Sequence, residues 1–193
     1  MVDIATGPGS SFLGALVPKL SERTRVVLSD ACADLVHALK AAWTREESKA
    51  PLDFLAFDGN HMPFRDESLD GLTSTLGFQS VRQDRRPERR QEEGLPWDHP
   101  YREARRVLKA DGCLFEAASR FHVPGSKTAI YLEEVGDFSG LEASMEKLWE
   151  ELEFDVVWSL RSETRRGKAN PEDGIPLDEA DEWFDVAYVL RKG

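Results

Sequence analysis

The sequence predicts an α/β fold whose sheet has seven strands, mostly parallel, with an antiparallel pair at the end of the chain. Short apolar runs alternate with amphipathic segments along most of its length, which is typical of a parallel sheet covered by helices. A glycine-containing turn links the first apolar run to the first amphipathic segment, and acidic residues lie within the first run and directly after the second and third. The last two runs are joined by a polar segment with no helical period, which favours antiparallel pairing.

The individual elements follow from the spacing of apolar residues. Strands are expected at residues 2–5, 25–28, 52–57, 69–74, 113–117, 154–161 and 183–190. Helices are expected at residues 12–20, 35–43, 101–109 and 141–152, where apolar residues share one helical face. Ser10 is a candidate N-cap for the first helix, and Asp111 with Gly112 is expected to turn the chain into the fifth strand. No repeat or linker divides the chain, so a single domain is expected over residues 1–193, with a core at 1–118 and a C-terminal helix and antiparallel strand pair at 139–193.

Composition excludes several classes of protein. The 193 residues include 36 Asp and Glu against 25 Lys and Arg, a formal charge of −11, and such a protein repels a nucleic-acid polyanion. The first residues do not resemble a signal peptide, and no apolar stretch approaches the roughly 18 residues of a membrane span, so membrane insertion is not expected. Cys32 and Cys113 are too few and too far apart for a disulfide framework or a metal site. A cytoplasmic protein without a bound metal is therefore expected.

Candidate ligand-binding residues lie at the carboxyl ends of the first three strands, where open α/β sheets bind ligands. The turn from Asp3 to Gly9 lets a ligand approach the backbone closely, although glycines there also suit a simple tight turn. Asp30 follows the second strand, where a carboxylate can accept hydrogen bonds from ribose hydroxyls or cap the next helix. Asp58 and Gly59 follow the third strand, where a carboxylate can accept from an exocyclic amine.

These segments together resemble the class I S-adenosylmethionine-dependent methyltransferases, and most closely the branch that contains the ubiquinone/menaquinone-type and many small-molecule enzymes. Residues 3–9 (DIATGPG) are similar to the family's D-x-[GA]-x-G-x-G loop, and residues 28–30 (LSD) to its ribose-binding acid. Residues 57–64 (FDGNHMPF) resemble D-A-x-x-L-P-F, residues 68–74 (SLDGLTS) resemble S-F-D-x-V, and residues 105–112 (RRVLKADG) resemble R-V-L-K-P-G-G. The resemblance covers residues 2–117 and implies a Rossmann-like seven-stranded methyltransferase sheet.

The resemblance also implies S-adenosyl-L-methionine as cofactor and a set of residues that contact it. They are Asp3, Ala5, Gly7 and Gly9 at its methionine part, Asp30 and Ala31 at its ribose and adenine, Asp58 and Gly59 at its adenine edge, and Thr75 and Leu76 beside the sulfonium. The implied activity is methyl transfer to a small-molecule substrate, with homo-oligomerisation left open. An acidic pocket suits the positive sulfonium.

Two departures from the family pattern keep other functions open. Ala110 and Asp111 replace a Pro-Gly pair, which is a variation within a turn. Met1 lies only two residues before Asp3, so the N-terminal helices that usually cover the cofactor are expected to be missing. The chain would then be a truncated fragment with weak cofactor binding, or a non-catalytic methyltransferase-like subunit whose partner supplies the cover. A nicotinamide-dependent oxidoreductase is disfavoured by Asp3 and by the absence of a third loop glycine.

No catalytic base is assigned from the sequence. The candidates are His61, His99 and His122, since an imidazole can accept a proton near neutral pH, and Glu116 on the fifth strand. For each histidine, an ordinary surface or capping role is the favoured interpretation. The arginine-rich segment 82–100 suits either a clamp for an acidic substrate or a solvated surface of mixed charge. The tryptophans at 43, 149, 158 and 183 are expected to pack in the core or at an edge.

Overall fold

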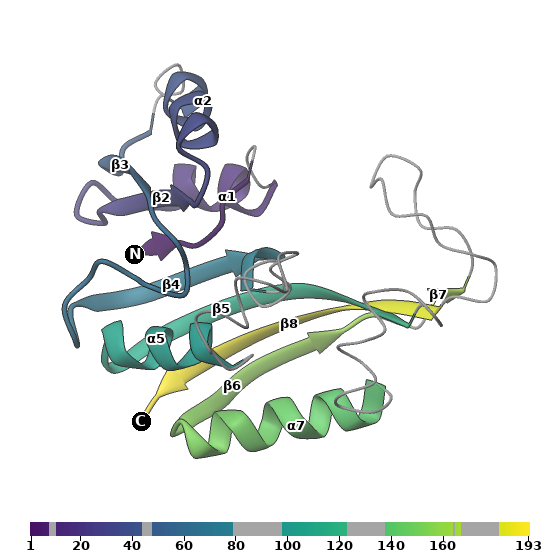
Figure 1. The fold of residues 1–193 in the computed structure, drawn as a ribbon. Coiled ribbons are helices and arrows are strands. Elements are labelled where there is room, and N and C mark those ends of the chain that lie inside the picture. The colour runs from purple at the N-terminus through teal and green to yellow at the C-terminus, as the bar shows by residue number, and fades with distance from the viewer. Residues whose placement is uncertain (8–10, 44–47, 79–97, 123–137, 164, 167–181) are drawn as a thin grey trace, which may run out of the picture.

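The computed structural model describes residues 1–7, 11–43, 48–78, 98–122, 138–163, 165–166 and 182–193, and the account below concerns these residues. They form one sheet with the strand order β3-β2-β1-β4-β5-β8-β6, and β7 pairs with β8 (Figure 1). The strands are β1 (Val2–Asp3), β2 (Val26–Asp30), β3 (Leu52–Ala56), β4 (Leu69–Thr75), β5 (Leu108–His122), β6 (Phe154–Arg161), β7 (Arg165–Arg166) and β8 (Glu182–Lys192). The neighbouring strands β3, β2, β1, β4 and β5 run parallel to one another, and β8 is antiparallel to both β5 and β6. The predicted fold class and antiparallel final pair are confirmed.

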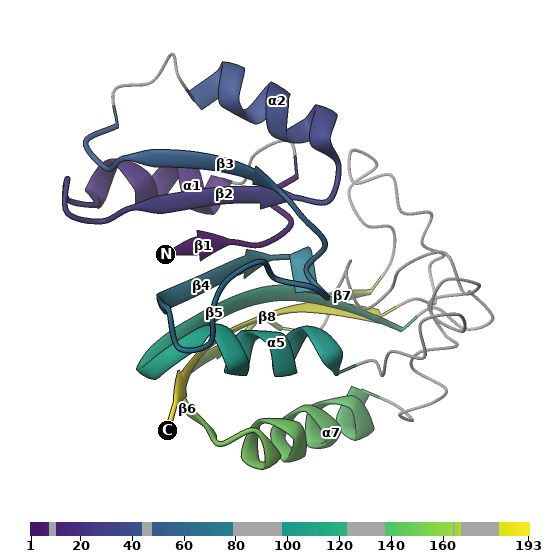
Figure 2. The same cartoon turned by 60° about the vertical axis from the view of Figure 1, so that its left-hand side comes forward.

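The helices lie on both sides of the sheet. They are α1 (Ser11–Leu16), the short 3₁₀ helix η1 (Val17–Lys19), α2 (Ala33–Trp43), α5 (His99–Val107) and α7 (Phe138–Glu151). Helices α5 and α7 cover one face of the β4, β5, β8 and β6 half, whereas α1 and α2 belong to the β1 to β3 half (Figures 1 and 2). No helix among the described residues is long and apolar enough to cross a membrane.

Two main apolar clusters hold these layers together. Leu13 of α1 and Leu39 of α2 pack with Val26 and Leu28 of β2. A larger cluster joins α5 and α7 to the opposite side of the sheet, and Trp149, Tyr101, Leu114 and Leu190 are among its buried members. Each fully buried side chain of this size contributes roughly 1.5–3 kcal/mol to folding, so the sheet and its helices form a firm support for the strand tips.

Several predicted boundaries were wrong, and the structure gives a physical reason for each. The first helix breaks into α1 and η1 because Pro18 cannot donate the backbone hydrogen bond that would continue it. Helix α5 ends at Val107 and not at residue 109. The expected turn at Asp111 lies inside β5, where the pairing of β4 with β5 shifts register between the Leu69–Leu108 and Gly71–Cys113 pairs. Strand β5 continues well beyond 117, since β8 pairs with it as far as His122. Ser10 lies outside the described residues.

Candidate active site at the carboxyl edge of the sheet

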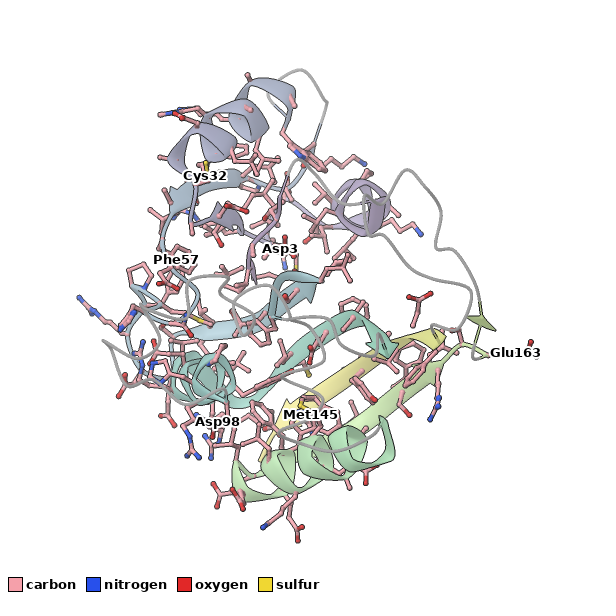
Figure 3. All side chains as sticks on the ribbon, turned by 45° about the vertical axis from the view of Figure 1, so that its right-hand side comes forward. Asp3, Cys32, Phe57, Asp98, Met145 and Glu163 are labelled. Atoms are coloured by element: carbon pink, nitrogen blue, oxygen red, sulfur yellow. The ribbon has the colours of Figure 1, made fainter. Side chains whose placement is uncertain are left out.

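The tips of β1, β2, β3 and β4 meet at one edge of the sheet because these neighbouring strands run parallel. The segments that follow them contain the acidic and turn residues singled out in the sequence. Figure 3 shows Asp3 in the interior of the molecule, whereas Glu163 lies far away, beyond the end of β6. The edge thus brings together residues that are more than fifty positions apart in the chain.

Asp3 is a buried carboxylate held by two threonine hydroxyls. Thr6 donates to its Oδ2 at 2.7 Å, and Thr73 of β4 donates to its Oδ1 at 2.6 Å. Burial raises the pKa of Asp3 to about 6, against the opposing effect of the two hydrogen bonds. A carboxyl with this pKa changes charge close to neutral pH, and a nearby cation would favour its ionised form.

The loop after β1 contains two residues in the left-handed backbone conformation. Ala5 and Gly7 both have positive φ, 51° and 64°. The Thr6 N–H donates to the Ser29 carbonyl at 2.7 Å, which fixes the turn against β2. A Cβ on Gly7 would meet no atom within 4 Å, so the backbone here borders open space. Positive φ explains the glycine, and the open space leaves room for a ligand against the loop. Gly9 lies outside the described residues.

The Asp30 carboxylate holds the turn that leads into α2 and retains capacity for a ligand. Its Oδ1 accepts from the Cys32 N–H at 2.9 Å, just before α2 begins, and its Oδ2 accepts from the Gly7 N–H at 3.1 Å. The second contact ties the β1 loop to the tip of β2. Each carboxylate oxygen has two lone pairs, so both can still accept from hydroxyl groups. Ala31 is exposed beside it.

Asp58 and Gly59 form a tight turn after β3. Asp58 Oδ1 accepts from the Asn60 backbone N–H at 2.9 Å and from the Asn60 side-chain amide at 3.1 Å. No described residue donates to its other oxygen. Gly59 is buried beneath this turn. The carboxylate is therefore oriented by its own loop and keeps one oxygen available as an acceptor.

The tip of β4 contributes one polar residue, Thr75, and one apolar residue, Leu76, to this edge of the sheet. Thr75 Oγ1 is buried and has no hydrogen-bond partner among the residues that the structure describes. Leu76 has a positive φ of 60° and is 47% exposed. Gly77 is required here because a Cβ would lie 2.3 Å from the Ile4 carbonyl oxygen, so the ends of β1 and β4 touch. An orphaned hydroxyl at this position indicates a site for a polar ligand group.

Of the candidate bases, His61 lies in the turn at the tip of β3, where its backbone N–H donates to the Asp58 carbonyl at 2.9 Å, and Glu116 lies inside the core. Glu116 is buried on β5 and accepts from the Tyr101 hydroxyl at 2.6 Å, which indicates a structural role. His61 and His99 lie side by side, with ring centroids 5.8 Å apart. The side chain of His122 lies outside the described residues, as does most of segment 82–100. No group of three or more potential ligands in the described parts of the chain could hold a metal ion.

The tryptophans divide between core and edge. Trp43 and Trp149 are buried, whereas Trp158 is 45% exposed on the edge strand β6. The side chain of Trp183 lies outside the described residues. The sequence alone does not single out Thr6 and Thr73 as donors to Asp3. Thr73 reaches Asp3 because the two residues are direct partners in the pairing of β1 with β4, and that register is known only from the fold.

Comparison with known proteins identifies the family. A family model described as a methyltransferase domain matches residues 2–115, more than half of the chain, and the chain belongs to this family. The resemblance to S-adenosylmethionine-dependent class I methyltransferases is confirmed at this level, and the nicotinamide-dependent alternative is set aside. The match ends at β5, so it includes all four strand tips that form the site.

Solved structures show the same fold over nearly the whole chain. The MccD protein superimposes with a TM-score of 0.65 at 13% identity, covering 100% of this chain and 89% of its own. A SAM-dependent methyltransferase from Methanosarcina mazei gives 0.62 at 14% identity, with coverages of 99% and 91%. The YcgJ protein from Bacillus subtilis gives 0.61 at 14% identity, with coverages of 99% and 90%. No curated protein matches by sequence.

Proposed function

We propose that the carboxyl edge of β1 to β4 binds S-adenosylmethionine and that the enzyme transfers a methyl group to a small-molecule acceptor. The observation that supports this most strongly is the spacing of three acceptors, Asp3, Asp30 and Asp58, on three adjacent strand tips. The cofactor has a cationic methionine part, a ribose diol and an adenine amine. Each acid suits one of these donors.

The residues present fit the cofactor in both charge and space. The open side of Gly7 provides room against the β1 loop, and the free oxygen of Asp58 provides an acceptor at the other end of the edge. The orphaned Thr75 hydroxyl lies between the β1 loop and β5. Ala5, Gly59, Ala31 and Leu76 would contact the cofactor through backbone and apolar atoms. Gly9 belongs to the same proposal.

When bound, the cofactor would supply a methyl group on a positively charged sulfur: the acceptor nucleophile bonds to the methyl carbon as the carbon–sulfur bond in line with it breaks, and S-adenosylhomocysteine leaves. The protein's contribution is mainly to hold the two reactants in that line. Asp3 would offset the positive charge, while Asp30 would fix the ribose. No side chain is assigned as a base, because Glu116 is engaged in the core and the histidine pair has no link to the β4 tip among the described contacts.

Calorimetry with S-adenosylhomocysteine, the demethylated cofactor, tests the binding part of the proposal. We expect Asp30→Ala to weaken binding by about 1–3 kcal/mol, because bound ribose hydroxyls lose their acceptor. Asp34→Ala is the matched control, since Asp34 lies four positions further on the exposed first turn of α2. Equal affinity of the wild type and Asp30→Ala would remove Asp30 from the site, and no binding by the wild type would refute the proposal.

Turnover on a panel of small molecules tests the catalytic part. Production of S-adenosylhomocysteine that depends on one acceptor supports the enzyme. Cofactor binding without turnover on any acceptor would instead support the non-catalytic subunit. We further propose that the reaction takes place in the cytoplasm, in agreement with the free cysteines Cys32 and Cys113.

A further inference from the structure

The half of the sheet formed by β4, β5, β8 and β6 has two unlike faces. Alternate residues of β5 and β8, such as Leu114 and Leu190, are buried under α5 and α7. The residues between them point to the opposite face and are half-buried. Helices α5 and α7 lie on the same side in both views, and no described helix covers the other side of this half (Figures 1 and 2).

A row of side chains crosses this second face from the proposed cofactor site to the sheet edge. Direct pairing aligns Thr75 of β4 with Ala117 of β5, Ala117 with Ala187 of β8, and Ala187 with Leu160 of β6. Cross-strand partners project to the same face, so these four side chains lie in line. Three steps of about 4.8 Å between strands give the row a length of roughly 14 Å.

The two ends of the row differ in chemistry. At the first end, Thr75 has a buried hydroxyl without a partner, and Thr73 on the same face donates to Asp3. At the other end, Leu160 is 60% exposed. Trp158 lies two residues earlier on β6, on the same face, and is 45% exposed. The two alanines between these ends have small side chains that leave space above the sheet. The row therefore runs from a polar group at the proposed cofactor site to two exposed apolar side chains at the sheet edge, which an apolar ligand would remove from water.

We propose that this surface, Thr75–Ala117–Ala187–Leu160 with Trp158, binds the methyl acceptor, and that the acceptor is an elongated, uncharged amphiphile. Its nucleophilic group would lie near Thr75, and an aromatic or hydrocarbon body would extend toward Leu160. The inference rests on the proposed function and deepens it. Continuity with the cofactor site favours an acceptor over a second copy of the chain. In addition, β6 has a register irregularity between Val156 and Trp158, which disfavours edge-to-edge strand pairing.

Charge also favours an uncharged body. None of the four side chains in the row is ionisable, and the Asp3 carboxylate near its inner end is assigned to the cationic cofactor. Asp185 of β8 and the Arg191–Asp155 ion pair lie on the same face but outside the row. A charged acceptor body along the row would lose its hydration without gaining a counter-ion from these four side chains. An apolar body loses nothing there and buries the two exposed side chains at the outer end.

A fluorescent probe with matched variants tests the inference. The probe is N-phenylnaphthylamine, a neutral amphiphile, titrated into the full chain saturated with S-adenosylhomocysteine. We expect Leu160→Arg to weaken probe binding about tenfold or more, equivalent to ~1.4 kcal/mol. Val156→Arg is the control, because Val156 lies on the same strand with 47% exposure but pairs with Leu190 on the opposite face. Leu160→Ala gives a milder loss and serves if the arginine variant does not fold.

Three results would overturn the inference while leaving the proposed function intact. They are failure of the wild type to bind the probe, equal losses in the Leu160 and Val156 variants, and dissociation of a wild-type dimer by Leu160→Arg in sedimentation velocity. In each case S-adenosylhomocysteine would still bind. Loss of S-adenosylhomocysteine binding in the wild type would instead refute the proposed function itself, and the two failures are thus distinguishable.

Discussion

The stability of this protein is expected to depend on the ionisation of Asp3, and replacement by asparagine isolates that dependence. Burial raises the pKa of Asp3 from 3.8 to about 6 in the folded chain. Because the folded state holds the proton more tightly than the unfolded state, Asp3 stabilises the fold most at acidic pH. That contribution is lost as the pH rises from about 4 to about 6.

The size of the effect follows from the difference between the two pKa values. At ~1.4 kcal/mol per pH unit, a rise from 3.8 to about 6 corresponds to roughly 3 kcal/mol of unfolding free energy. Asp3→Asn stays neutral at every pH, so it does not show this loss. The difference in unfolding free energy, variant minus wild type, should therefore become more positive by roughly 3 kcal/mol between pH 4 and pH 7.

Urea denaturation of both proteins at several pH values provides the measurement, and other titrating groups cancel in the difference. A difference that stays constant with pH, or one that falls, would refute the assignment of a raised pKa to Asp3. The same ionisation should govern cofactor affinity. A cationic ligand prefers the carboxylate, so the affinity of wild-type protein for S-adenosylmethionine should fall below pH 6, and Asp3→Asn should show weak binding without that pH dependence.

Other substitutions test packing around the site. Gly77→Ala should destabilise the fold by about 1–3 kcal/mol in urea denaturation, because its Cβ would lie 2.3 Å from the Ile4 carbonyl oxygen; an unchanged midpoint would contradict the close approach. Gly14→Ala is its control on α1, where a Cβ meets open space, and it should stabilise by about 0.5–1 kcal/mol. Tyr101→Phe removes the hydroxyl that donates to buried Glu116 and should cost about 1–3 kcal/mol, whereas no change in thermal midpoint would contradict the proposed structural role of Glu116.

The sequence predicted the strand tips well because their identity depends on local chemistry. Asp30 and Asp58 follow apolar runs directly, and a parallel sheet necessarily brings such residues to one edge. It predicted element ends poorly where tertiary pairing decides them. Strand β5 runs to His122 because β8 pairs with it, and β8 comes from a part of the chain sixty residues later. The two-residue strand β7 has no pattern of its own that a sequence could reveal.

The contacts of Asp3 could be predicted only in part for the same reason. An aspartate at the end of a strand signals a polar site, but its raised pKa arises from burial beneath the loop and β4. Thr73 reaches it because Asp3 and Thr73 are direct partners in the β1–β4 register. The sequence lists both residues, and only the strand order makes them neighbours.

Thr73 links the two halves of the sheet in chemistry as well as in space. Its hydroxyl donates to Asp3, which faces the proposed cofactor, while Thr75 two positions later begins the row proposed for the acceptor. Strand β4 is the shared element, parallel to β1 on one side and to β5 on the other. Because a methyl group moves between two ligands in line, both must be positioned against one rigid reference. Close packing of Gly77 against Ile4 fixes the end of β4 to the end of β1. Strand β4 therefore sets the position of the proposed acceptor surface and also donates, through Thr73, the hydrogen bond that favours the ionised form of Asp3.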